Sequence, residues 1–336
     1  MDNFEALKEL LDQPRKIVIF PHRKPDADAL GASLALAAFL NKKGHEATVI
    51  SPTDYPDFLN WLPGNECVLV YEGNNTKAEN LISESDVLFC LDFSSLDRID
   101  NLGPIVAKST ATKVLIDHHL GKEDFADFEL WNPKSAATAE LVFDFINLFG
   151  DSNAIDLPMA QCIYAGIMTD TGSFKYSSTS GKTHTIIADL LDRGLKQEEI
   201  HRNIFDVNTE NRIKFLGYAL NEKLVILHEY KTAYIAITAE ELVRFQLKTG
   251  DTEGLVNYPL SIQGIKLAVL FTDRSEHISM SFRSVGDFSV SEFANAHFNG
   301  GGHKNASGAA VKNMTLDEVV ERFNKLLPFY REQLNK

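Results

Sequence analysis

Side chains that can bind metal ions follow the first strongly apolar run of the sequence. The segment HRKPDAD, residues 22–28, comes directly after the run at residues 16–20. Pro25 cannot continue a strand, so we expect a loop at the strand's carboxyl end, where open α/β sheets bind ligands. An imidazole and carboxylates suit manganese, magnesium or zinc. The alternative, which explains this segment equally well, is that Asp28 caps a helix and Asp26 is solvated.

Further carboxylates and imidazoles stand at the ends of other predicted elements. Asp92 closes an apolar run, the triplet D-H-H at residues 117–119 closes another, and Asp170 lies where a helical pattern ends. Several buried like charges require cations to compensate them. The set therefore predicts two divalent ions about 4 Å apart, an arrangement used for in-line displacement at phosphorus.

The elements that must position these groups alternate along the first half of the chain. Short apolar runs are separated by helical or loop segments, at residues 16–20, 46–50, 66–71, 86–92 and 113–117. This alternation indicates βαβ units around a mostly parallel sheet flanked by helices. Residues 136–171 have helical periodicity, and Ser135 and Thr138 are interpreted as caps of the helix that begins near them.

The later part of the chain predicts a connector and a second domain. Charged amphipathic helices fill residues 181–222, and strand-like runs then restart. The fold class is therefore α/β, with a smaller C-terminal α/β domain that contains a mixed sheet. We predict a catalytic domain at 1–190, a helical connector at 191–222 and a substrate-binding domain at 223–336.

Bulk composition restricts the partners and the compartment. The net charge is −14 and no basic block is present, so binding to long duplex nucleic acid is not expected. No apolar run approaches the roughly 18 residues that span a bilayer, and the N-terminal residues lack the pattern of a signal peptide. Three widely spaced cysteines fit a reducing compartment. We expect a cytoplasmic protein that does not bind membranes.

The ordered motifs resemble one known family. H-x-x-P-D-x-D at residues 22–28, the strand-terminal Asp92, D-H-H and the later Asp170 resemble the four motifs of the DHH phosphoesterases. The sequences SFRS at 281–284 and GGGHKNASG at 300–308 resemble the DHH-associated C-terminal domain. In length, layout and glycine-rich loop, the chain is similar to the bifunctional oligoribonuclease (nanoRNase)/pAp phosphatases of this family.

The resemblance implies a role for each motif residue. It implies two divalent ions, with Mn²⁺ expected and Mg²⁺ or Co²⁺ as alternatives, held by His22, Asp26, Asp28, Asp92, His118 and Asp170. His119 would face the substrate as donor or general acid, and Asp117 would orient a histidine. The C-terminal motifs would bind the substrate through Ser281, Arg283, Gly301, Gly302 and His303.

The implied activity is hydrolysis of short oligoribonucleotides to mononucleotides, together with removal of the 3′-phosphate of pAp. The alternative is a phosphodiesterase for linear or cyclic dinucleotides such as pApA or c-di-AMP. An inorganic pyrophosphatase or exopolyphosphatase, or an inactive nucleotide-binding module, is less favoured. Short RNA or small nucleotides are the expected partners, and a homodimer is left open.

Overall fold

The chain divides into two compact units, with the boundary between Val207 and Asn208. The structure is a computed structural model that describes residues 3–150 and 152–336. The predicted connector, residues 191–222, is shared between the units, and the domain boundaries expected at 190 and 222 stay predictions. Among the described residues, none of the helices combines the length and the apolar character that a membrane span requires.

The first unit contains a six-stranded parallel sheet in the order β3-β2-β1-β4-β5-β6. Its strands are β1 (Lys16–Phe20), β2 (Glu46–Ser51), β3 (Leu69–Val70), β4 (Val87–Leu91), β5 (Thr112–Asp117) and β6 (Phe128–Trp131). The strand order reverses between β1 and β4, and the carboxyl ends of strands at such a point form the usual ligand-binding crevice. The predicted strand at 66–71 is only two residues long, because a 3₁₀ turn occupies Asn65–Cys67.

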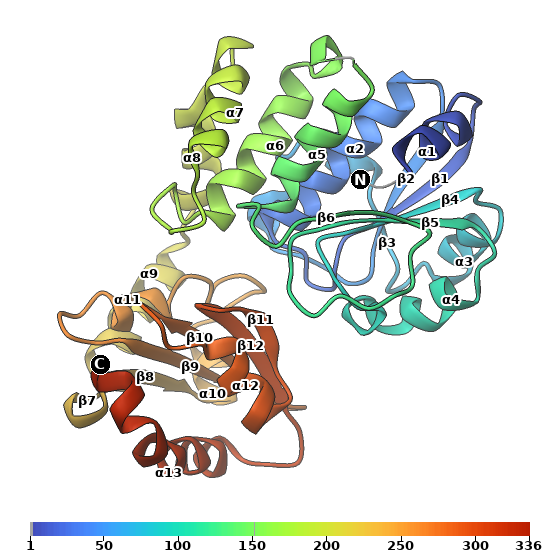
Figure 1. Ribbon diagram of the computed structural model, residues 1–336. Helices are drawn as coiled ribbons and strands as arrows, with labels where there is room; N and C mark the ends of the chain where they lie inside the picture. Colours follow the sequence, from blue (N-terminus) through green and yellow to red (C-terminus); the bar gives the residue numbers. More distant parts are fainter. Residues whose placement is uncertain (1–2, 151) are drawn as a thin grey trace. The chain divides into compact units, whose positions relative to one another are not determined.

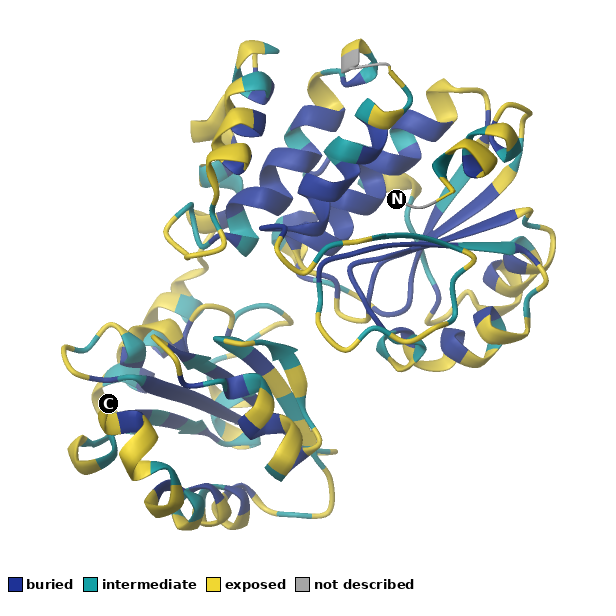
Figure 2. Ribbon diagram, viewed as in Figure 1, coloured by how far each residue is buried: buried dark blue, intermediate teal, exposed yellow. Residues whose placement is uncertain are grey.

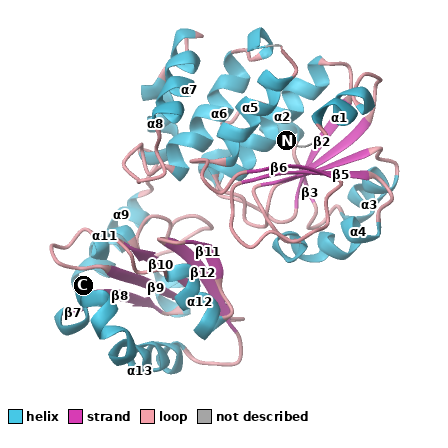
Figure 3. Ribbon diagram, in the orientation of Figure 1, coloured by secondary structure: helices cyan, strands magenta, loops and turns pink. Residues whose placement is uncertain are grey.

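Helices cover both faces of this sheet (Figures 1 and 3). The helices are α1 (Phe4–Leu10), α2 (Ala27–Lys42), α3 (Asn75–Ser83), α4 (Gly103–Lys108), α5 (Thr138–Leu148), α6 (Leu157–Asp170), α7 (Gly181–Asp192) and α8 (Gln197–Phe205), with 3₁₀ turns at Asp57–Leu59, Asn65–Cys67, Leu96–Leu102 and Ser152–Ala154. On one face α2, α5 and α6 pack side by side, and α2 is buried along most of its length (Figure 2). On the other face, α3 and α4 cover strand residues of the opposite parity.

Close packing of α2 on α6 depends on two glycines. A Cβ atom at Gly31 would lie 2.5 Å from the carbonyl oxygen of Cys162, and one at Gly166 would lie 2.7 Å from the carboxylate of Asp28. Real Cβ atoms do not approach other atoms so closely, so both positions require glycine. The first turn of α2, which carries Asp28, is therefore held directly against α6.

The second unit contains a six-stranded mixed sheet in the order β11-β12-β10-β9-β8-β7. Its strands are β7 (Leu224–Leu227), β8 (Thr232–Ile237), β9 (Leu267–Asp273), β10 (Ile278–Ser284), β11 (Gly301–His303) and β12 (Ala306–Val311). Only β8 and β9 pair in parallel. The helical segments are α9 (Glu210–Tyr218), a π-helical turn (Ala219–Lys223), a 3₁₀ turn (His228–Tyr230), α10 (Ala239–Arg244), α11 (Asn257–Leu260), α12 (Val290–Phe298) and α13 (Leu316–Asn335).

Separate apolar clusters fill the two faces of this mixed sheet. Residues of α12 and α13 form one cluster, and residues of α9 and α11 contribute to the other. The predicted fold class is confirmed in both units: a parallel sheet flanked by helices, and a smaller α/β unit with a mixed sheet.

Candidate metal centre

The loop after β1 places two carboxylates in different surroundings. Asp26 is the N-cap of α2, because its Oδ1 accepts hydrogen bonds from the backbone N–H groups of Asp28 and Ala29 at 2.9 and 3.0 Å. Asp28 lies in the first turn and is buried. The alternative in which Asp28 caps the helix and Asp26 is merely solvated is therefore wrong. Asp26 still exposes half of its side chain, and its Oδ2 lies 4.0 Å from Nε2 of His22.

The buried carboxylate of Asp28 is held by the N-terminus of another helix. The backbone N–H of Thr138 donates to Asp28 Oδ2 at 2.7 Å, and that of Ala139 donates to Oδ1 at 2.8 Å. These are among the first N–H groups of α5, which have no partner inside their own helix. They also carry the positive end of the helix dipole, which favours a carboxylate.

Asp92 follows β4 with a backbone φ of 65°, a value that residues other than glycine rarely adopt. Its carboxylate is buried, and each of its two oxygens lies near a different imidazole. Oδ1 lies 3.5 Å from Nε2 of His118, and Oδ2 lies 3.5 Å from Nε2 of His22. Strained backbone that is held by its surroundings is common at functional sites. Asp92 is thus placed where one carboxylate can serve two neighbouring ions.

Both predicted histidine ligands turn the same ring nitrogen towards the carboxylates. Nδ1 of His22 lies 2.8 Å from the carbonyl oxygen of Arg23, and Nδ1 of His118 lies 3.1 Å from that of Ser135. A carbonyl only accepts, so in this arrangement Nδ1 carries the proton and Nε2 keeps its lone pair. Metal-binding histidines are commonly oriented in this way. Nε2 of His118 also lies 3.2 Å from Oδ2 of Asp170 at the end of α6.

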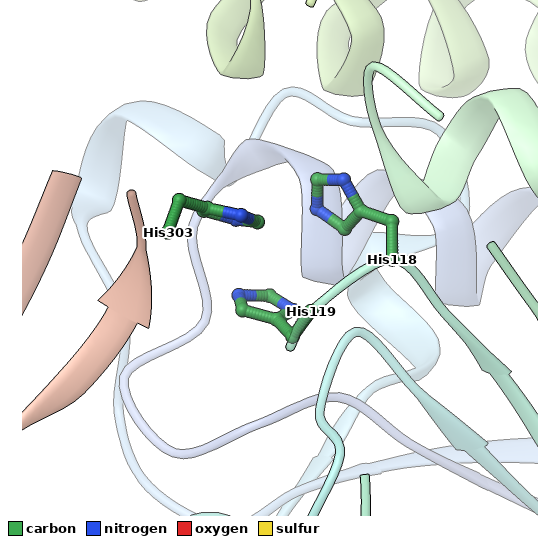
Figure 4. A group of neighbouring side chains, drawn as sticks. All are labelled: His118, His119 and His303. Atoms are coloured by element: carbon green, nitrogen blue, oxygen red, sulfur yellow. The ribbon is translucent and has the colours of Figure 1, made fainter. Parts of the chain in front are cut away.

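The second histidine of the D-H-H triplet has a carboxylate partner. Figure 4 shows the rings of His118 and His119, whose centroids are 4.9 Å apart at an angle of 76°. Nδ1 of His119 donates to Oδ1 of Asp117 at 2.8 Å. The other oxygen, Asp117 Oδ2, is buried and has no hydrogen-bond partner within the described part of the chain. Asp117 is therefore placed to orient His119.

The charges of this cluster do not balance without cations. Burial, together with Asp92 and Asp170, raises the pKa of Asp28 well above its usual range. Burial also raises the pKa of Asp170, to about 6. In contrast, hydrogen bonds to His118 and His22 outweigh burial and hold the pKa of Asp92 well below its usual range.

The two imidazoles respond in the opposite sense to the same contacts. Burial alone would lower the pKa of His118, but Asp92 and Asp170 raise it well above its usual value. The pKa of His22 is raised by Asp92 and Asp26 against the effect of burial. Without metal, the cluster thus retains protons that divalent cations would displace.

The donor set fits two ions of a hard or borderline metal. Among the described residues of the first unit, three groups of three side chains each bring ligand atoms within 4.8 Å of one another. One is Asp92–Asp117–His119, and the other two consist of predicted ligands: His22–Asp26–Asp92 and Asp28–Asp92–His118. Asp92 belongs to all three and is the residue that the two groups of predicted ligands share. Nitrogen and oxygen donors of this kind suit manganese, magnesium, cobalt or zinc, and a carboxylate shared by two groups suits a bridging ligand.

The predicted substrate-binding residues of the second unit lie on neighbouring strands. Arg283 on β10 and His303 on β11 are both paired with Ala306 of β12, so they occupy one row across three strands. Ser281 lies two residues before Arg283, on the same half-exposed face of β10. Gly301 pairs with Gly308, which also pairs with Ser281, so these residues form a second row two residues away from the first.

Glycine is required at only one of the two predicted glycine contacts. Gly302 has a φ of 139°, and a Cβ atom there would lie 2.7 Å from the carbonyl oxygen of Ala306. A Cβ atom at Gly301 would meet open space. The backbone of β11 at Gly302 can therefore lie against β12 only because it lacks a side chain.

Sequence reasoning missed several groups that the structure places at the cluster. Thr138 contacts two of the predicted ligands, although its expected role was a helix cap. Arg98 is half-buried, and its charge, like burial, opposes the net rise in the pKa of His22. Trp131 donates from its indole N–H to the carbonyl oxygen of His119 at 2.7 Å. The segment that contains Thr138 follows D-H-H closely, but no spacing rule links it to Asp28.

Comparison with known proteins assigns this fold and cluster to a class. The family model described as DHH family, N-terminal domain, matches residues 16–167, and the DHHA1 domain matches residues 230–335. The crystal structure of an exopolyphosphatase-related protein from Bacteroides fragilis is 39% identical, with a TM-score of 0.93, over 99% of this chain and 97% of that one. The chain is therefore a phosphoesterase, an enzyme that hydrolyses phosphate esters. It belongs to the DHH family, which confirms the resemblance seen in its motifs.

Two curated relatives carry more specific names. The bifunctional oligoribonuclease and PAP phosphatase NrnA of Thermus thermophilus is 28% identical over 95% of this chain and 90% of its own length. The cyclic-di-AMP phosphodiesterase PdeA of Listeria monocytogenes is 24% identical over 97% of this chain, which corresponds to 49% of its own length. Both are similar to this chain across its two units.

Proposed function

We propose that this protein is a metal-dependent phosphohydrolase that degrades short oligoribonucleotides to mononucleotides and removes the 3′-phosphate of pAp. The observation that carries the proposal is the pair of ligand groups that share Asp92. The similarity to an oligoribonuclease and PAP phosphatase over 95% of the chain supports the choice of substrate. The net charge of −14 supports a short substrate over a long one.

The proposed cofactor is a pair of divalent ions, with Mn²⁺ expected and Mg²⁺ or Co²⁺ as alternatives. The proposed ligands are the members of the two groups of predicted ligands together with Asp170, whose carboxylate lies 3.2 Å from Nε2 of His118. They are His22, Asp26, Asp28, Asp92, His118 and Asp170. Such ions supply a nucleophile at neutral pH and neutralise charge that develops on the phosphoryl group. The N–H groups of α5 orient Asp28, and the backbone carbonyls of Arg23 and Ser135 orient His22 and His118, before any ion binds.

We assign proton transfer to His119. Asp117 accepts the hydrogen of its Nδ1, which leaves Nε2 as the atom that can exchange a proton with the leaving group. The role of Asp117 is to hold the ring and to stabilise its protonated form, as a carboxylate does for a catalytic histidine elsewhere. Arg283, Ser281 and His303 are proposed to bind substrate phosphate, because a guanidinium suits bidentate phosphate recognition, with Gly301 and Gly302 offering backbone N–H groups.

A second candidate is hydrolysis of linear or cyclic dinucleotides, which the similarity to a cyclic-di-AMP phosphodiesterase favours. An inorganic pyrophosphatase, an exopolyphosphatase or an inactive binding module is less favoured. We also propose a cytoplasmic location, because the three cysteines of the chain are free. A homodimer stays open.

The test is a substrate panel with Mn²⁺, comparing pAp, a five-nucleotide RNA, pApA, c-di-AMP, pyrophosphate and long single-stranded DNA. We expect turnover of pAp and of the short RNA, and a loss of at least about 100-fold in the Asp92→Asn variant, since it removes the shared ligand. Faster turnover of pApA or c-di-AMP would favour the second candidate. Hydrolysis of pyrophosphate alone, or nucleotide binding without hydrolysis, would overturn the proposal.

A further inference from the structure

Thr138 donates two hydrogen bonds, one from its backbone N–H and one from its hydroxyl, and both go to proposed metal ligands. It is the first residue of α5 and is fully buried. Its backbone N–H donates to Asp28 Oδ2 at 2.7 Å, and its hydroxyl donates to Asp92 Oδ1 at 2.8 Å. The expected role of Thr138 as a helix cap is wrong, because the N-cap is Ala137. The carboxylate of Asp28, from α2, accepts the N–H groups that a capping side chain would satisfy.

The hydroxyl bond fixes the rotation of the Asp92 carboxylate. Oδ1 receives the hydrogen of Thr138 and faces His118, while Oδ2 faces His22. If this carboxylate turned about its Cβ–Cγ bond, the hydroxyl bond would break inside a buried site, where a lost hydrogen bond is expensive. The bond therefore keeps one oxygen on each side of the cluster.

We propose that Thr138 is a positioning residue that sets the geometry of the metal centre by holding Asp28 and Asp92 together. The inference rests on the proposed function, since it assumes that these carboxylates bind metal. Asp28 lies in the first turn of α2 and Asp92 directly follows β4, so the two proposed ligands belong to segments far apart in the sequence. Thr138 joins them through one residue, and its own position is fixed by the packing of α5 on α2 and α6.

The same helix offers a matched control. Two residues further along α5, the buried carboxylate of Glu140 accepts a hydrogen bond from the hydroxyl of Thr183 at 2.9 Å. Thr183 is also fully buried. The Thr183→Val variant thus removes a buried threonine–carboxylate bond to α5 without touching a proposed ligand. It reports what the loss of such a bond does to stability, together with the loss of the capping box that the Thr183 hydroxyl forms with Ser180 at the start of α7.

The experiment measures Mn²⁺ binding by titration calorimetry of full-length protein freed of metal with EDTA, and confirms the Mn²⁺ environment by electron paramagnetic resonance. Thr138→Val keeps the shape and the backbone N–H but lacks the hydroxyl, and Thr138→Ser restores it. We expect Thr138→Val to bind Mn²⁺ about 10- to 100-fold more weakly, the usual effect of removing a partner of a metal ligand. Thr138→Ser should bind within about threefold of the wild type, and Thr183→Val should lose thermal stability without losing affinity.

Each contrary outcome has a definite meaning. Mn²⁺ affinity of Thr138→Val within twofold of the wild type would overturn the positioning role while leaving the proposed function intact. Equal weakening in Thr138→Ser or Thr183→Val would also overturn it, since the hydroxyl at this position would not be the cause. A wild-type protein that binds no Mn²⁺, Mg²⁺ or Co²⁺ would instead overturn the proposed metal centre, and the positioning role with it.

Discussion

Asp170 is the ligand candidate whose replacement gives the clearest prediction about stability. It ends α6, and its carboxylate lies 3.2 Å from Nε2 of His118. Its pKa is raised from the ordinary value of 3.8 to about 6, because burial and the neighbouring carboxylates Asp26 and Asp92 outweigh the opposite effect of His118. Asp170→Asn removes the charge and resembles the protonated acid. The metal-free variant should therefore be more stable than the metal-free wild type.

The size and pH dependence of this effect follow from linkage. The folded protein binds the proton of Asp170 more tightly than the unfolded chain does, so wild-type stability falls as the pH rises from 3.8 towards 6. Since one pKa unit corresponds to about 1.4 kcal/mol, the loss reaches about 3 kcal/mol above pH 7. At pH 5 the variant should be more stable by roughly half that amount, and near pH 3 the difference should vanish.

Urea denaturation in EDTA at pH 8, 5 and 3 measures these differences. The control is Asp124→Asn, an exposed aspartate in the same unit, which should change stability by less than about 0.5 kcal/mol. Mn²⁺ at 100 times its Kd should remove most of this difference at pH 8, because one ion then stabilises the wild type by about 2.7 kcal/mol, and the variant should gain far less. A metal-free Asp170→Asn protein no more stable than the wild type at pH 8 would refute the reasoning about buried like charges.

Two glycine substitutions test the packing that supports each set of candidate residues. Gly302→Ala should reduce stability by about 1–3 kcal/mol and raise KM, because the methyl group would clash with the backbone of β12. The control Gly301→Ala places its methyl group in open space and should behave like the wild type. Equal effects of the two substitutions in thermal melts and kinetics would contradict this prediction. Gly166→Ala should weaken Mn²⁺ binding and destabilise the protein by about 1–3 kcal/mol, because its Cβ would clash with the carboxylate of Asp28. The control Gly217→Ala, in α9, should be neutral or stabilising. Unchanged Mn²⁺ affinity and melting temperature in Gly166→Ala would contradict this prediction.

The sequence predicts the place of those cluster residues that directly follow or close an apolar run. A carboxylate that closes an apolar run must lie at a strand end, and the parallel sheet places the ends of β1, β4 and β5 side by side. Asp92 and the D-H-H triplet could therefore be assigned to one edge from the sequence. The fold class followed from the same alternation of apolar runs and helical segments.

Other features depend on contacts that no local pattern encodes. The strand β6 was missed, because its residues, Phe128–Trp131, are half-exposed and lack a long apolar run. The sequence alone does not show which of Asp26 and Asp28 caps the helix, because both aspartates lie at the start of the same helix. What distinguishes them is a pair of backbone N–H groups more than a hundred residues away along the chain.

This distinction explains why the metal centre can be built before any ion arrives. Asp28 would be a costly buried charge, yet two backbone N–H groups and the positive end of α5 offset part of that cost. Burial and the neighbouring carboxylates nevertheless raise the pKa of Asp28 well above its usual range, and the pKa of Asp170 is raised to about 6. Each carboxylate therefore holds a proton more tightly than an ordinary aspartate does, so ion binding at either one competes with that proton. Mn²⁺ affinity should accordingly fall at both proposed sites between pH 7 and 5, and an affinity that does not change over this range would contradict this argument.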